Sequence, residues 1–221
     1  MPSIILCGMY EYYERTEKKG QVLIMKRIKA ILTVGCMALL LCACDMIGGS
    51  VDTTTVSFQK DGGVTQIIVE DFSQPYYNAE ELEGDITSKI MDYNAKTGVE
   101  DAIVLKDVKL GEDKRICVKI EFKSSADYKS FNEKELFCGM VADAYREGYE
   151  FTTMRDVAQE GVVLSAADVL EKGDMHMIIL EEAQQVIVPG KICYISDGIS
   201  IVEEKRAVNL NEGQKAFIIY E

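Results

Sequence analysis

An uncharged run near the amino-terminal end divides this chain into a leader and a longer segment that we expect to form the folded part. From Ala30 to Cys44 no residue is charged, and Leu, Ile, Val, Ala and Cys predominate. Three basic residues lie within positions 26–29 just before the run, and Asp45 ends it. A membrane-spanning helix needs roughly 20 apolar residues, and this run is shorter. A basic segment followed by a short apolar run is typical of an export signal.

The end of the run carries a cleavage motif, Leu41-Cys42-Ala43-Cys44. It resembles the lipobox of bacterial lipoproteins, in which a Leu stands three residues before an invariant Cys and a small residue directly precedes that Cys. Cys42 departs from the Ala, Ser or Val that is typical of its position. The resemblance implies that residues 25–43 are a signal peptide, that the Cys44 thiol receives a diacylglycerol, and that cleavage after Ala43 follows. Since two acyl chains suffice for stable anchoring, it also implies a lipid anchor on the extracytoplasmic face of the cell membrane.

Two other interpretations of the apolar run are weaker. An uncleaved anchor helix is disfavoured by length, and a buried helix of a soluble domain by the absence of a polar face at helical spacing. Residues 1–24 place acidic and basic side chains ahead of a signal whose basic segment should come first. We therefore expect Met25 to be the true start and residues 1–24 to be an over-extended gene prediction. A genuine long leader is the alternative.

Charge restricts the partners of the remaining chain. The full sequence holds 24 Lys and Arg against 37 Asp and Glu. Residues 1–43 contain six of the basic and three of the acidic residues, which leaves a formal charge of −16 after cleavage. Nucleic acid is disfavoured as a partner because phosphate binding requires clustered Lys and Arg. Direct adhesion to anionic headgroups is disfavoured too, so the lipid is the expected membrane contact.

Hydrophobic patterns predict an α+β fold for the segment 53–150, which follows a short Gly- and Ser-containing tether over residues 44–52. Two β-rich runs flank a turn at residues 60–63 and predict a hairpin. A helix is expected over residues 79–95, capped by Asn78 and ended by Gly98. A second hairpin follows around residues 111–113. We expect an antiparallel sheet in β-β-α-β-β order, covered on one face by this helix.

The segment 151–221 predicts short helices and then a C-terminal β-meander. Ser165 and Asp168 have the spacing of a capping box. Earlier in the chain, Ser125 is expected to cap another short helix, and a third is expected to present one face. That face consists of Met140, Val141, Ala144 and Tyr145. Whether residues 53–150 and 151–221 form one domain stays open.

Three cysteines remain beyond Cys44, and their spacing gives no zinc pattern. Alternation along its strand predicts that Cys117 faces outward, whereas Cys138 and Cys193 lie in apolar surroundings typical of small buried residues. One disulfide plus a free thiol, or no disulfide, are both compatible with these positions.

No catalytic or cofactor motif is present, and we assign no catalytic residue, metal ligand or cofactor. The GxSxG, HExxH, P-loop and GxGxxG patterns are all absent. The single histidine lies in Met175-His176-Met177, which offers soft donors to copper. Methionines in a strand rich in Ile and Leu are more often packing residues, and we interpret them so.

Carboxylates and tyrosines are the other candidates for chemistry or binding. Glu181-Glu182 and Glu203-Glu204 are compatible with calcium, but the EF-hand pattern is missing, and we interpret both pairs as solvated strand ends. Tyrosines that an exposed aromatic patch would use are Tyr76, Tyr77, Tyr128, Tyr145 and Tyr149. We expect most of them at the edge of the core.

Together these patterns predict a lipid-anchored, non-enzymatic binding or scaffolding protein of the cell envelope. Its segmentation is similar to that of uncharacterised exported lipoproteins of Gram-positive-type bacteria. An envelope protein, a cell-wall polymer or a small ligand would be the partner. The alternative is an envelope hydrolase that uses two carboxylates.

Overall fold

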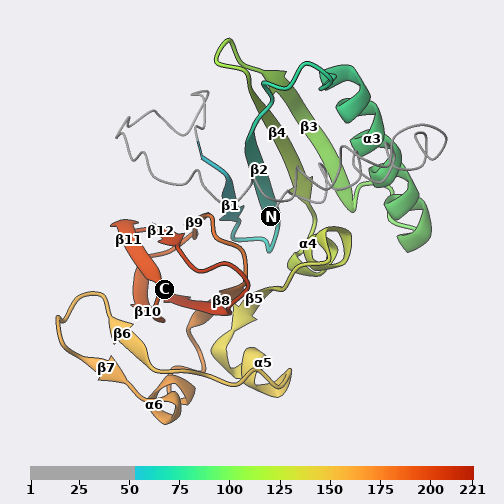
Figure 1. Cartoon of the computed structure of the whole chain (residues 1–221). Coiled ribbons are helices and arrows are strands. Elements are labelled where there is room, and N and C mark those ends of the chain that lie inside the picture. Colours follow the sequence, from blue (N-terminus) through green and yellow to red (C-terminus); the bar gives the residue numbers. More distant parts are fainter. Residues whose placement is uncertain (1–52) are drawn as a thin grey trace, which may run out of the picture.

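Two β-sheets and several helices make up the computed structural model, which describes residues 53–221 (Figure 1). Antiparallel pairs dominate both sheets, so the expected mixed fold with antiparallel sheets and short helices is confirmed at this level. The strands are β1 (Thr55–Phe58), β2 (Val64–Asp71), β3 (Ile103–Leu110), β4 (Arg115–Phe122), β5 (Leu136–Met140), β6 (Met154–Asp156), β7 (Val163–Leu164), β8 (His176–Leu180), β9 (Gln185–Ile187), β10 (Ile192–Ile195), β11 (Ile199–Glu203), β12 (Arg206–Asn209) and β13 (Ala216–Tyr220). The helices are α3 (Ala79–Thr97), α4 (Ser125–Asn132), α5 (Val141–Arg146) and α6 (Ala166–Leu170).

The larger sheet has seven strands in the order β11-β12-β9-β1-β2-β4-β3. Its N-terminal part is built from the two expected hairpins, since β1 pairs with β2 and β3 with β4. Gly62 in the first turn has a φ of 89°, a left-handed conformation that glycine adopts without strain. β1 also pairs in parallel with β9, so that Thr55 lies opposite Gln185. This pairing joins the first described strand to a strand that lies about 130 residues later in the chain.

Helix α3 lies along β3 and covers one face of the larger sheet (Figure 1). The Asn78 side chain accepts hydrogen bonds from the backbone N–H groups of Glu80 and Glu81, and Gly98 ends the helix at a φ of 71°. Both expected ends of the helix are therefore confirmed to within two residues. Its buried face consists of Leu82, Ile86 and Ile90.

The burial pattern along strand β4 shows that one face of this sheet is covered more fully than the other. Ile116, Val118 and Ile120 are buried, and the residues between them are only partly so. Cys117 belongs to the second set, which confirms that it faces away from the main core.

The smaller sheet has six strands in the order β5-β8-β13-β10-β6-β7. The C-terminal strands do not run as a meander: between β8 and β13, only β11 and β12 are neighbours both in sequence and in a sheet. Strands β8, β10 and β13 belong to the smaller sheet, and β9, β11 and β12 to the larger. The meander prediction was wrong because turn signals locate strand ends but carry no information about which distant strand becomes the partner.

The smaller sheet is buried on both faces. One face of β8 and β13 joins the main core through Ile178, Leu180 and Ile218. The opposite face packs with α5 and α6 around Met177, Ile179 and other buried apolar residues. Double burial explains the uninterrupted apolar runs in β8 and β13, which show no alternation with polar residues.

The short helices differ from expectation in detail. Ser124, not Ser125, caps α4 by accepting a hydrogen bond from the backbone N–H of Asp127. The expected face of α5 is only half right, since Val141 and Ala144 are buried but Met140 and Tyr145 are exposed. At α6 the capping box is confirmed, and its residues are Ser165 and Asp168.

Candidate functional site

The residues of the lipobox, Leu41, Cys42, Ala43 and Cys44, lie outside the described residues, as does the tether to position 52. The description begins at Thr53, two residues before β1. No helix within residues 53–221 combines the length and apolar character needed to cross a membrane.

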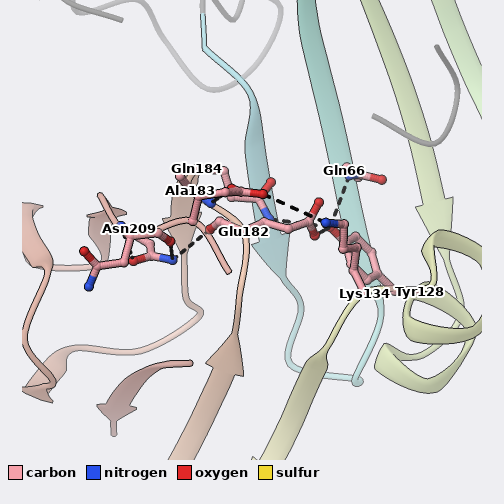
Figure 2. A network of polar contacts seen from close by, with 9 residues as sticks. Gln66, Tyr128, Lys134, Glu182, Ala183, Gln184 and Asn209 are labelled. Carbon is pink, nitrogen blue, oxygen red and sulfur yellow. Dashed lines mark hydrogen bonds and ion pairs between the residues drawn. The ribbon is translucent and has the colours of Figure 1, made fainter. Parts of the chain in front are cut away.

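Within the described part, the most elaborate polar arrangement is centred on the buried hydroxyl of Tyr128 (Figure 2). This hydroxyl donates a hydrogen bond to Oε2 of Glu182 at 2.5 Å. It accepts one from Nε2 of Gln66 at 3.1 Å and a longer one from Nε2 of Gln184 at 3.5 Å. We call these four residues the crossover network.

Its members come from three parts of the fold. Gln66 lies on β2 of the larger sheet, and Tyr128 lies on α4, which connects β4 of that sheet to β5 of the smaller. Glu182 and Gln184 lie in the link between β8 and β9, where the chain passes back to the larger sheet. The crossover network therefore joins the two sheets where the chain changes from one to the other.

Further hydrogen bonds fix the link that carries Glu182. Nδ2 of Asn209, at the end of β12, donates to the carbonyl oxygen of Glu182 at 2.8 Å. The backbone N–H of Ala183 donates to Oε2 of Glu212 at 2.9 Å, and Lys134 Nζ lies 3.9 Å from the other oxygen of that carboxylate. Figure 2 shows these contacts as a continuous path from β12 to α4.

Burial shapes the electrostatics of this network. It raises the pKa of the Tyr128 hydroxyl well above its ordinary value, and the neighbouring Glu182 charge acts in the same direction. Burial also raises the pKa of the Glu182 carboxyl, although the hydrogen bond from Tyr128 and the charge of Lys134 oppose that shift. The interpretation of Glu182 as a solvated strand end was therefore wrong, because its side chain points into the junction of the sheets.

The remaining sequence candidates are scattered. Glu203 and Glu204 are exposed at the end of β11, as expected of solvated carboxylates. Of the five tyrosines, Tyr128 is fully buried, and Tyr76 and Tyr145 are exposed at distant places in the chain. His176 is the exposed first residue of β8, and Met177 beside it is completely buried.

The thiols are unpaired, which answers the question that the spacing left open. Cys117, Cys138 and Cys193 are all free and partly buried. Burial raises the pKa of each thiol above its ordinary value. A raised pKa favours the protonated thiol, and because the thiolate is the reactive form, all three are poor nucleophiles at neutral pH.

A shallow depression of about 240 Å³ lies beside β5 and α5, away from the crossover network. It contains an ion pair between Arg146 and Asp143 on α5. Its lining residues are Phe137, Cys138, Gly139, Asp143, Arg146 and Glu147. Glu182, whose carboxyl pKa is raised by burial, is not among them.

Sequence patterns missed the crossover network, although one signal was present. Gln66 occupies an inward position of β2 between the buried residues Val64 and Ile68. A polar side chain in such a row needs a buried partner, because an unsatisfied amide in the core is costly. The identity of that partner depends on how α4 folds back onto the sheet.

Comparisons with protein families, with curated proteins and with solved structures find no match to this chain.

Proposed function

We propose that this chain is a lipoprotein of the cell envelope, held on the extracytoplasmic face of the membrane by lipid on Cys44, and that it acts there by binding or scaffolding. The motif Leu41-Cys42-Ala43-Cys44, behind a basic segment and a short apolar run, carries the proposal. Only the residues 45–54 separate Cys44 from β1. At no more than roughly 3.5 Å per residue, such a segment keeps the folded part close to the bilayer.

Exposed apolar side chains around one hairpin support binding as the activity. Val157, Val162 and Val163 in and around the β6–β7 hairpin are 37%, 41% and 57% exposed, and Leu170 on the adjoining α6 is 40% exposed. Clusters of exposed apolar side chains mark interaction surfaces more often than isolated ones do. An envelope protein, a cell-wall polymer or a small ligand is the proposed partner. The acidic charge of the mature chain argues against nucleic acid.

Replacement of the acylated cysteine tests the anchor. We expect Cys44→Ala to abolish incorporation of labelled palmitate and to move the protein from the membrane to the soluble fraction. Cys42→Ala is the matched control, since it removes the neighbouring thiol and yet leaves a lipobox with a typical residue. Full membrane association of Cys44→Ala without label, or loss of label in Cys42→Ala alone, would contradict the assignment.

The binding activity is tested by crosslinking in the native envelope. A photoreactive side chain at Val163 should capture a partner that the same group at Tyr76, an equally exposed residue between β2 and α3, does not capture. Equal products from both positions would indicate nonspecific proximity and count against the β6–β7 hairpin as the binding surface.

A second candidate function, an envelope hydrolase, is favoured by one observation. The Glu182 carboxyl has a raised pKa, and the nearby Glu212 charge contributes to that shift. Glycoside hydrolysis uses a carboxyl group with a raised pKa together with a second carboxylate. Release of soluble sugar from cell-wall polymer, lost in Glu182→Gln, would establish this activity; its absence in the wild type would exclude it for that substrate.

A further inference from the structure

Strand register in the smaller sheet brings three metal-binding side chains to one face. Strands β5 and β8 are antiparallel neighbours, with Met140 opposite His176 and Cys138 opposite Ile178. Residues directly opposed in a sheet share a face, and so do residues two positions apart on one strand. Met140, Cys138 and His176 therefore share a face. Met177, adjacent to His176 in sequence, points to the opposite face and is fully buried there.

Tyr220 on β13 contacts two of these side chains, those of His176 and Cys138. Its ring stacks on that of His176, with 5.2 Å between centroids and 18° between planes. Its side chain is also hydrogen-bonded to that of Cys138. Because β8 lies between β5 and β13, this bond crosses β8 beside His176. The Cys138 thiol and the His176 imidazole therefore both contact the side chain of Tyr220.

The spacing that this strand register implies suits a single small ion. Opposed residues in an antiparallel pair have Cβ atoms roughly 4.5–5.5 Å apart, and diagonal neighbours are roughly 7–8 Å apart, within reach of long side chains. Met140 and His176 are the opposed pair, and Cys138 and His176 are the diagonal one. Met140 and His176 are exposed and Cys138 is a free, partly buried thiol, so an ion can enter from solvent.

We propose that Cys138, Met140 and His176 form a binding site for Cu(I). A thiolate, a thioether and an imidazole are the donor set that selects this soft ion over hard cations. On binding, Cu(I) forms a bond to the Cys138 sulfur and displaces the thiol proton to water, without any change of oxidation state. Within residues 53–221 no three His, Cys, Asp or Glu side chains gather to hold a metal, so this site depends on the methionine sulfur.

The test uses the full chain, purified and titrated anaerobically with Cu(I) against a competing chelator. We expect Cys138→Ser to weaken the site about 100-fold or more, and His176→Gln and Met140→Leu about 10-fold or more, since even outer partners of a metal cost that much. Controls are Cys193→Ser and Met91→Leu, a free thiol and an exposed methionine elsewhere in the fold, which should leave the affinity unchanged. X-ray absorption should show sulfur and nitrogen donors, with the nitrogen lost in His176→Gln.

Equal Cu(I) affinity in Cys138→Ser and Cys193→Ser would overturn the site, as would unchanged affinity and nitrogen scattering in His176→Gln. If Cys138→Ser fails to fold, His176→Gln and Met140→Leu test the site instead, because both residues are exposed and neither change removes a buried side chain. Every variant keeps the same Cys44, so the outcome does not depend on whether that residue carries lipid.

Discussion

Tyr128 is the side chain on which the crossover network depends, because its hydroxyl is both donor and acceptor there. Tyr128→Phe removes that hydroxyl and leaves the Gln66 amide and the Glu182 carboxyl without this partner. Leaving buried polar groups unsatisfied costs about 1–3 kcal/mol, and we expect the free energy of unfolding to fall by that amount. Urea denaturation measures it. Tyr145→Phe, at a residue that is 59% exposed, should change it by less than about 0.5 kcal/mol.

Glu182 makes stability depend on pH in a direction opposite to that of a salt-bridged carboxylate. Burial raises the pKa of its carboxyl in the folded state, so between the unfolded and folded pKa values the folded chain holds more protons than the unfolded chain. Stability contributed by the protonated form is therefore lost as pH rises through that window. Removal of the ionisable group should flatten this dependence.

The matching experiment compares wild type with Glu182→Gln by urea denaturation from pH 4 to pH 8. We expect the variant to gain stability relative to wild type as pH rises above about 4.3, the ordinary value for a glutamate. Glu204→Gln, at an exposed carboxylate outside the crossover network, is the control. A stability difference between wild type and Glu182→Gln that is constant across this range would show that Glu182 does not titrate differently on folding.

At the scale of elements, α3 is defined by its ends and by one apolar stripe. The Asn78 oxygen accepts bonds from two backbone N–H groups that the helix itself cannot satisfy. We expect Asn78→Ala to destabilise the fold by about 1 kcal/mol, measured by thermal or urea unfolding. Asn78→Ser keeps a capping oxygen and should cost only a few tenths of that. Equal losses in both variants would mean that the amide acts through something other than capping.

The parts of the fold that could be predicted from the sequence are those that depend on interactions between residues close together in the chain. Helix α3 and the two N-terminal hairpins were predictable because caps, turns and periodicity are local signals. The parallel pairing of β1 with β9 was not, because no local pattern specifies a partner 130 residues away. The candidate site shows the same division: Gln66 signals a buried partner, but Tyr128 and Glu182 meet it only through long-range packing.

At the scale of the whole molecule, the chain is interleaved rather than divided. It passes from one sheet to the other after β4, β8, β9, β10 and β12. The main core also takes buried residues from both sheets, among them Val56 of β1 and Ile218 of β13. Because strands of the two sheets alternate along the chain, unfolding of either sheet should disturb strands that are linked in sequence to the other.

This interleaving predicts one cooperative unfolding transition rather than two separate ones. Two variants report on it, each keeping one thiol beyond Cys44: Cys117 on β4 of the larger sheet or Cys138 on β5 of the smaller. After the two variants are matched for overall stability by circular dichroism, pulsed thiol labelling in urea should give the same midpoint for both. A lower midpoint for Cys138 would show that the smaller sheet opens on its own. In that case the crossover network would not couple the two sheets, and loss of the Tyr128 hydroxyl would not be expected to reduce the stability of both.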